Sequence, residues 1–172
     1  QSNSHYNLIP TGNGKVLLAA PAVEMYWIDT QGNGSYTSAG QRGDDGLAFS
    51  GNTVMFEAGK ILKVGGSSWN NNTPSSASAY LLNTNNGGVD VQKLPPMAYP
   101  RTFSNSVVLP NGQVLVVGGQ TNTLEFSDSN AVLAPEIFDP TTQKFTVLPP
   151  MKVARNYHSV AVLLPDARAM VG

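Results

Sequence analysis

A tyrosine and a histidine stand next to each other in the stretch Arg155-Asn156-Tyr157-His158-Ser159, which leads into an apolar run at 160–164. Successive residues of a strand point to opposite faces, but a bulge or a strand end re-aims one of them. At a strand end both side chains could therefore reach one metal ion. A phenolate oxygen with an imidazole nitrogen suits copper(II). The alternative is structural, with the tyrosine in the core and the histidine bonded to a nearby turn.

The composition of the 172-residue chain limits the classes of partner. Hydrophobic residues make up 41% and charged residues 12%, and the net charge of -1 comes without a basic cluster. Phosphate binding requires concentrated Lys and Arg, so we expect no nucleic-acid partner. No apolar run approaches the length of a membrane span, and we expect no membrane contact. The length suffices for one domain with a core.

The chain has no cysteine, so disulfide bonds give no indication of the cellular compartment, which has to be inferred from other features. A low charge with many Asn, Ser, Thr and Gly residues is typical of extracellular proteins. Acceptor tripeptides for N-glycosylation begin at Asn33 (NGS) and Asn71 (NNT), although such tripeptides also occur by chance. We therefore expect a secreted glycoprotein with glycans at these two residues.

Apolar residues occur in short runs bounded by Gly, Pro, Asn and Asp, which predicts strands rather than helices. Four segments share one plan, in which an apolar run, a polar turn and a second apolar run follow one another. The turn residues are Gly14, Gly59, Gly112 and Ala167, at spacings of 45 to 55 residues. Each segment therefore predicts a β-hairpin, although Ala167 departs from the glycine of the other three turns.

A second pair of strands follows each of the first three hairpins, with outer strands expected at 35–37, 89–91 and 144–147. Two hairpins make a four-stranded sheet, and such sheets in tandem at about 50 residues are typical of kelch-type propeller blades. The fourth repeat ends after its first hairpin. We therefore expect an all-β fold in which residues 1–172 are one propeller segment of about three and a half blades. It would belong to a larger, seven-bladed ring, without the preceding blades and a following C-terminal domain.

Several motifs tie these repeats to a known family. They read APAVEMYW at 20–27, SAGQR at 38–42, GNTVMF at 51–56, RTF at 101–103, FSD at 126–128 and RNYHS at 155–159. With them the chain resembles, over essentially its whole length, the copper-radical oxidases of the galactose oxidase and glyoxal oxidase group. The RNYHS motif is the most specific of these, because the Gly-Gly pairs at 65–66 and 118–119 are shared with generic kelch repeats.

The resemblance implies roles for the adjacent pair. Tyr157 would be the axial ligand of one copper ion and the base that takes the substrate hydroxyl proton, and His158 would be an equatorial ligand. A copper-bound phenol loses its proton well below its ordinary pKa of about 10. The family also uses a second tyrosine cross-linked to a cysteine, as the radical site, and a second histidine. Both are expected outside this segment, so we expect the segment alone to be inactive.

The resemblance also implies substrate contacts. Phe103 and Phe126 match aromatic pocket positions, and we expect both rings to approach Tyr157 near the propeller axis, since Phe103 and Tyr157 follow Arg101 and Arg155 by the same interval. The structural alternative for both phenylalanines is packing inside a blade. A polar loop carries Trp69 with Asn70 and Asn71, which suits sugar stacking and hydroxyl binding. The comparison with the family implies that Asn70 and Asn71 replace the galactose-binding Tyr-Gln pair of this loop. Glyoxal-like aldehydes and other primary alcohols are therefore alternative substrates to galactose.

The remaining candidates favour structural roles. Asp44 and Asp45 lie between glycines, which predicts a turn rather than paired catalytic carboxylates or a calcium site. Arg101 and Arg155 recur at one blade position, where we expect them to bond turn carbonyls between blades. His5, near the start of the chain, is uninformative.

Two functions are compatible with these residues. The first is a segment of a secreted copper-radical oxidase that oxidises a small alcohol, an aldehyde or a sugar and reduces O₂ to H₂O₂. The second is a non-catalytic kelch propeller that binds a glycan or a protein. In both cases the segment would pack against the rest of its own propeller.

Overall fold

The computed structural model describes residues 5–69 and 71–172, and no helix occurs among them. Nothing helical in this part of the chain is long and apolar enough to cross a membrane. The first sheet consists of β1 (Asn7–Pro10), β2 (Val16–Ala20), β3 (Glu24–Asp29) and β4 (Ser35–Gln41). The second consists of β5 (Asn52–Glu57), β6 (Lys60–Val64), β7 (Ala79–Asn83) and β8 (Asp90–Lys93). The third consists of β9 (Asn105–Val108), β10 (Val114–Val117), β11 (Glu136–Asp139) and β12 (Lys144–Val147), and β13 (Ala161–Leu163) and β14 (Ala169–Val171) complete the described strands.

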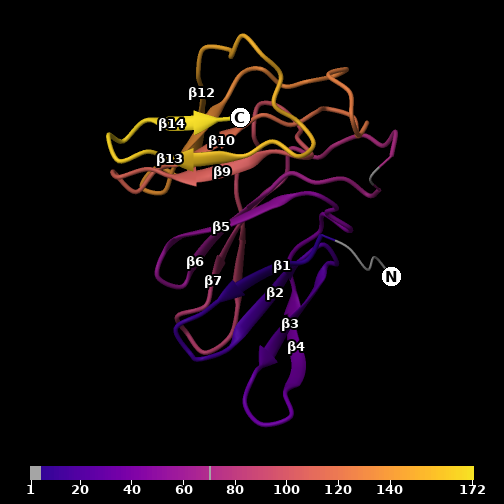
Figure 1. The fold of residues 1–172 in the computed structure, drawn as a ribbon. Coiled ribbons are helices and arrows are strands. Elements are labelled where there is room, and N and C mark those ends of the chain that lie inside the picture. Colours follow the sequence, from indigo (N-terminus) through magenta and orange to yellow (C-terminus); the bar gives the residue numbers. More distant parts are fainter. Residues whose placement is uncertain (1–4, 70) are drawn as a thin grey trace.

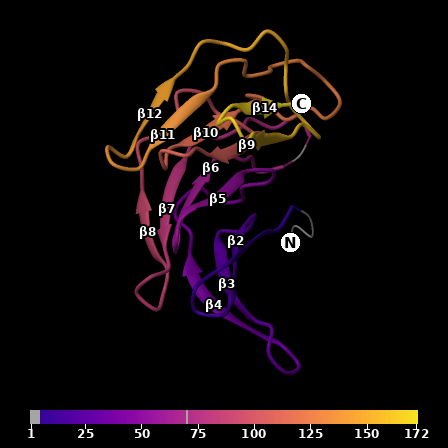
Figure 2. The same ribbon diagram turned by 60° about the vertical axis from the view of Figure 1, so that its left-hand side comes forward.

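Consecutive strands pair antiparallel, so the described residues form three four-stranded sheets and one two-stranded sheet. The sheets follow one another as blades along an open arc, from β1–β4 to β13–β14 (Figure 1). The view from the side shows the same succession, with β4, β8 and β12 at the outer edge of their blades (Figure 2). The predicted all-β propeller segment, with three whole blades and a half blade, is confirmed.

The hairpin turns share one backbone conformation. Gly14, Gly59 and Gly112 have φ angles of 78°, 74° and 82°, and Ala167 has 67°. Alanine at this position therefore keeps the turn, at a conformational cost that glycine does not carry.

Each blade packs flat against the next. The seam between the first two blades buries residues from β2 and β3 against β6 and β7, including Leu17, Met25, Ile61 and Leu82. The next seam buries Leu62 and Val64 against β10 and β11, and the last packs Leu115 and Val117 against β13 and β14. Neighbouring residues of β6 and of β10 thus face opposite blades, as the alternation of a strand requires.

The first strands of successive blades lie side by side, since β1 contacts β5, β5 contacts β9 and β9 contacts β13. In a propeller these innermost strands surround the central axis. The segments that lead into them are therefore the parts of the chain that meet near that axis.

In the second and third blades, a Gly-Gly pair joins the blade to the segment that leads into the next one. The Gly119 amide donates to the Arg155 carbonyl at 2.8 Å, and the Gly66 amide donates to the Arg101 carbonyl at 2.8 Å. A Cβ atom on Gly118 would lie 2.1 Å from the Arg155 carbonyl oxygen. Only glycine permits this approach, so these pairs fix where Arg101 and Arg155 stand.

Arg101 is fully buried and structural, as expected, but its side chain bonds its own blade rather than a neighbour. It donates to the Gly118 carbonyl at 2.9 Å, to the Ala134 carbonyl, and to the Glu136 carboxylate at 2.9 Å. The contact between blades runs instead through its backbone carbonyl, which accepts from Gly66. Burial lowers the pKa of Arg101, and the ion pair with Glu136 opposes that shift.

Asp44 and Asp45 are also structural. The Asp45 carboxylate lies buried between Arg42, at 2.9 Å, and Lys63. The Asp44 carboxylate accepts from the Tyr80 hydroxyl and from Lys93. Both acidic residues therefore bind the linker at 42–46 to the second blade.

Candidate functional site

Four residues at corresponding points of the four blades share a left-handed backbone. His5, Ser50, Phe103 and His158 have φ angles of 60°, 46°, 62° and 65°. Each stands nine positions before the turn residue of its hairpin and two before the first paired residue of the inner strand. We call them the entrance residues. Positive φ is uncommon and strained outside glycine, and such strain clusters at functional sites.

The fourth blade differs from the third in the length of the segment that leads to its inner strand. Four positions separate Arg101 from Asn105, the first paired residue of β9, whereas five separate Arg155 from Val160, which pairs with Gly172. Counted back from the strand, Phe103 therefore corresponds to His158. The expectation that Phe103 and Tyr157 are equivalent is wrong, because counting from the arginines misses this additional residue.

The additional residue and the positive φ bring Tyr157 and His158 together. Their rings stack with centroids 3.9 Å apart and an interplanar angle of 26°. Two adjacent residues of a regular strand would point apart, so the turn at His158 is what places both rings on one side. Among the described residues, neither the Tyr157 hydroxyl nor the His158 imidazole is hydrogen bonded.

Two phenylalanines complete an aromatic cluster. Phe103 stands 5.1 Å from Tyr157 at 64°, and Phe126 stands 5.1 Å from Tyr157 at 88°. Phe126 also meets His158 edge-on, at 5.8 Å. The predicted approach of Phe103, Phe126 and Tyr157 is confirmed. Phe103 is buried, whereas Phe126 is 83% exposed, which argues against a packing role for Phe126.

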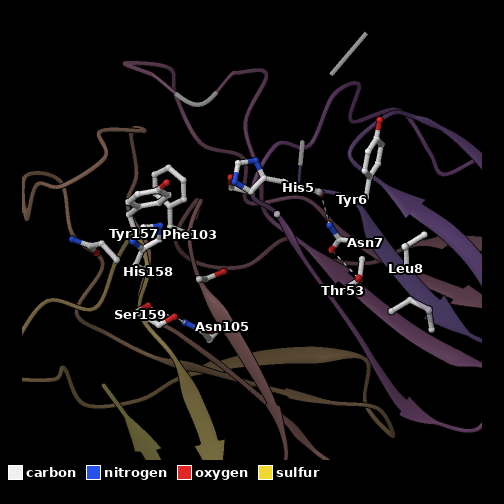
Figure 3. A pocket seen from close by; sticks show the side chains of 15 residues that line it. His5, Tyr6, Asn7, Leu8, Thr53, Phe103, Asn105, Tyr157, His158 and Ser159 are labelled. Carbon is white, nitrogen blue, oxygen red and sulfur yellow. Dashed lines mark hydrogen bonds between the residues drawn. The ribbon is translucent and has the colours of Figure 1, made fainter. Parts of the chain in front are cut away.

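The cluster borders a cavity of about 510 Å³ between the inner strands, which we call the axial cavity. Figure 3 shows Tyr157, Phe103 and His158 on one side of it and His5 on the other. Ser50, the entrance residue of the second blade, also lines it, so all four entrance residues face one space.

His5 was missed from the sequence. Its ring contacts Phe49 edge-on, at 6.4 Å between centroids, and its backbone carbonyl accepts from the side-chain amide of Asn7 at 2.9 Å. The nine-residue spacing to Gly14 was the signal that could have found it, since the same spacing leads to His158.

The polar loop of the second blade lies away from the axial cavity. Trp69 packs edge-on against Phe49, at 5.2 Å, and is 56% exposed. Asn71 is exposed and its carbonyl accepts from Thr73, while Asn70 lies outside the described residues. Asn33 is exposed in the turn before β4. Substrate binding by this loop and glycosylation at Asn33 and Asn71 stay predictions.

The donor atoms at the cluster fit copper, as far as this chain supplies them. Tyr157 offers a phenol oxygen and His158 an imidazole nitrogen, which are ligand types that copper(II) prefers. Among the described residues, no group of three or more His, Cys, Asp or Glu side chains could hold a metal ion. Two ligands on one segment hold a metal weakly, so a complete site needs further ligands.

The comparisons with known proteins agree with this geometry. A family model described as "Glyoxal oxidase N-terminus" matches residues 65–172. "Galactose oxidase" of Gibberella zeae is 35% identical over 181 residues, which cover 100% of this chain and 27% of that protein. "Aldehyde oxidase GLOX1" of Arabidopsis thaliana is 34% identical over 92 residues, covering 51% of this chain and 15% of that protein.

A solved structure extends the match to three dimensions. It is described as a novel fungal alcohol oxidase with catalytic diversity among the AA5 family, in complex with copper. It superimposes with a TM-score of 0.95 and 44% identity, over 98% of this chain and 36% of that one.

Fold and comparisons together define a kelch-type propeller segment. The chain belongs to the copper-radical oxidase family of galactose oxidase and glyoxal oxidase, as its motifs predicted. It spans 27% of the length of the galactose oxidase and 36% of the solved alcohol oxidase.

Proposed function

We propose that the protein is a secreted copper-radical oxidase, in which residues 1–172 carry half of the copper ligands. The reaction would convert a primary alcohol to an aldehyde, or the hydrated form of an aldehyde (its adduct with water) to an acid, and two electrons and two protons would pass to O₂ to give H₂O₂. The observation that carries this proposal is the stacked Tyr157–His158 pair, held at the axial cavity by a segment one residue longer than its counterpart.

Tyr157 and His158 would hold the copper ion, and bound copper would supply one-electron redox chemistry and lower the phenol pKa. The Tyr157 oxygen would accept the hydroxyl proton of the substrate, as a general base must within hydrogen-bond reach. His158 would be a ligand, and its positive φ fixes the side from which it approaches.

Apolar and polar residues line different parts of the axial cavity and would bind different parts of the substrate. Phe103 and Phe126 form an apolar surface beside Tyr157, which would pack against the carbon chain of the substrate and exclude water. His5 lines the same cavity and is exposed, and its imidazole suits a second hydroxyl or carbonyl group. Ser50 also lines the cavity, but its hydroxyl is buried. This supports small hydroxylated alcohols, aldehydes or sugars as the substrate class.

The polar loop with Trp69 would bind the part of a larger substrate that extends beyond the axial cavity. Trp69 packs on Phe49 and is 56% exposed, Asn71 is exposed on the same loop, and neither residue lines the axial cavity. Sugar stacking there, with Asn70 as a neighbour, would extend the site. The exposed positions of Asn33 and Asn71 support secretion with attached glycans.

A non-catalytic propeller that binds a glycan or a protein is the second candidate. One observation favours it: Trp69 exposes 56% of its surface on a polar loop outside the axial cavity. An exposed aromatic beside amides is a common element of binding surfaces.

The test uses the full-length protein loaded with copper. Peroxide is measured with galactose, glycerol and methylglyoxal, and copper content is measured in parallel. His158→Ala removes a ligand and should weaken copper binding at least about tenfold. His5→Ala removes an imidazole from the same cavity without removing a ligand, so it should keep wild-type copper content. Peroxide formation by copper-free protein, or full copper affinity in His158→Ala, would overturn the proposal.

A further inference from the structure

The loop that carries Phe126 is held in place by hydrogen bonds rather than by burial. Phe126 is 83% exposed and has a φ of 55°, yet its ring stands edge-on to both Tyr157 and His158. An exposed side chain gains little from core packing. The position of this ring therefore depends on what fixes the backbone on either side of it.

Gln120 holds the loop from inside its own blade. This residue is fully buried, and its amide nitrogen donates to the Ser127 carbonyl at 2.7 Å and to the Ser129 carbonyl at 2.9 Å. Its amide oxygen accepts from the Leu124 amide at 3.2 Å. These bonds shape the loop but do not connect it to Tyr157.

Asn156 makes that connection. Its amide nitrogen donates to the Ser127 carbonyl at 3.1 Å and, more weakly, to the Asp128 carboxylate at 3.4 Å. Asn156 directly precedes Tyr157, and Ser127 directly follows Phe126. The bond therefore links the neighbours of two rings that stand 5.1 Å apart.

The oxygen of the Asn156 side-chain amide indicates that this side chain does not make its most favourable contribution to the stability of the fold. Asn156 is 8% exposed, and its Oδ1 atom is buried without a hydrogen-bond partner among the described residues. Such an orphaned acceptor costs about 1–3 kcal/mol. Turning the amide over would not help, because the oxygen would then face the Ser127 carbonyl and the Asp128 carboxylate. Unsatisfied groups of this kind are expected where function outweighs stability.

We propose that Asn156 is a positioning residue that sets the gap between Phe126 and Tyr157 and thereby selects substrates by size. It lines both the axial cavity and a second cavity of about 260 Å³, which Phe126 and His158 border. With the bond in place, the Phe126 ring packs over a small substrate. Without the bond, the loop moves away and admits a larger one. The selection by size rests on the proposed oxidase function, whereas the tethering of the loop does not.

The tethering is tested by hydrogen exchange on the full-length protein without copper. Asn156→Ala should speed exchange of the amides at 124–131 at least about fivefold, because the loop loses its link to the fourth blade. Asn105→Ala is the matched control. Asn105 donates to Ser159, at 2.9 Å to the hydroxyl, on the other side of Tyr157. The Asn105→Ala variant should therefore exchange the amides at 124–131 at the wild-type rate.

Selection by size is tested with copper-loaded protein and two primary alcohols, 1-propanol and benzyl alcohol. Asn156→Ala should raise the ratio of kcat/KM for benzyl alcohol over 1-propanol at least about fivefold, mainly through a higher KM for 1-propanol. A purely structural defect would lower kcat for both alcohols equally and leave the ratio unchanged. Asn156→Asp keeps the shape but removes the donor, so it should shift the ratio as Asn156→Ala does.

The outcomes separate the two claims. Unchanged exchange at 124–131 in Asn156→Ala overturns the tethering. Faster exchange with an unchanged ratio overturns the selection by size, as does a wild-type ratio in Asn156→Asp. A wild-type protein without turnover on any alcohol or aldehyde overturns the oxidase function and the selection with it, while the exchange result still decides the tethering.

Discussion

The segments that lead into the third and fourth blades both begin with an arginine, Arg101 and Arg155, but they differ in structure. In the third, Arg101 is fully buried, and the next residue, Thr102, exchanges two backbone bonds with Gln120. In the fourth, Arg155 is only partly buried, and one additional residue places Tyr157 and His158 side by side. A single added residue thus distinguishes a structural joint from a segment with two adjacent side chains of the types that copper(II) prefers.

The segment that leads into the second blade lacks the arginine of the other two segments. Ala48 stands where the other two have arginine, and the Gly65 carbonyl instead accepts from Lys63 at 2.7 Å. The corresponding Gly118 carbonyl accepts from Arg101. The carbonyl after the second strand therefore accepts from a buried basic side chain in both blades. In the second blade this side chain comes from β6, and in the third it comes from the segment that precedes β9. Lysine can lose its proton under conditions in which arginine keeps it.

The largest effect is expected from Arg101→Met in the full-length protein. The substitution leaves the Glu136 carboxylate buried, and the donors that remain to it among the described residues are the Ala98 and Tyr99 backbone amides. Breaking a buried ion pair in this way costs about 3–5 kcal/mol, so the thermal midpoint of the propeller should fall clearly. The double variant with Glu136→Gln should recover part of that loss. An unchanged midpoint in Arg101→Met would show that the third segment is not the structural joint described above.

Tyr157→Phe tests the other side of the comparison. It removes the hydroxyl and keeps the ring that contacts Phe103, Phe126 and His158. If Tyr157 is the base proposed above, turnover of the copper-loaded full-length protein should fall about a hundredfold or more, while the thermal midpoint stays near the wild-type value. Oxygen consumption and copper content are measured on the same preparation. Wild-type turnover would remove Tyr157 from the chemistry and leave the added residue without a function.

The smallest expected effect is a dependence of folding stability on pH, which Lys63 should cause and Arg101 should not. Burial lowers the pKa of Lys63 to about 8, from 10.5 in the unfolded chain, and Asp45 opposes the shift. Above about pH 8 the unfolded chain therefore binds the additional proton, and this residue makes the fold more stable as the pH rises. Below about pH 8 both states are protonated, and the cost of burying the charge is constant.

The measurement compares wild type with Lys63→Met in chemical unfolding. From about pH 7 to 9.5 the wild type should gain about 2 kcal/mol over the variant. The scan stops there, because burial and the bond to Asp44 raise the pKa of Tyr80, so that residue destabilises the fold with rising pH once tyrosine ionises in the unfolded chain. Arg101→Met should show no comparable slope against wild type. A flat difference for Lys63→Met would contradict its replacement of arginine at this joint.

The sequence determined the hairpins and the number of blades, because strand periodicity and turn residues are local properties. Gly14, Gly59 and Gly112 marked three turns, and Ala167 fell into the same φ region as they did. The motif around Tyr157 and His158 also identified the family, since its residue types and order are specific enough without coordinates.

The tertiary structure decided which residues share the axial cavity. His5 faces Tyr157 across more than 150 positions of sequence, and Phe126 reaches it from a loop whose place depends on Gln120 and Asn156. Register decided the rest: counted from the strand, His158 rather than Tyr157 is the counterpart of Phe103. Backbone pairing across a sheet fixes such correspondences, and spacing along the chain alone leaves them uncertain by one residue, which is enough to exchange the side chains at a site.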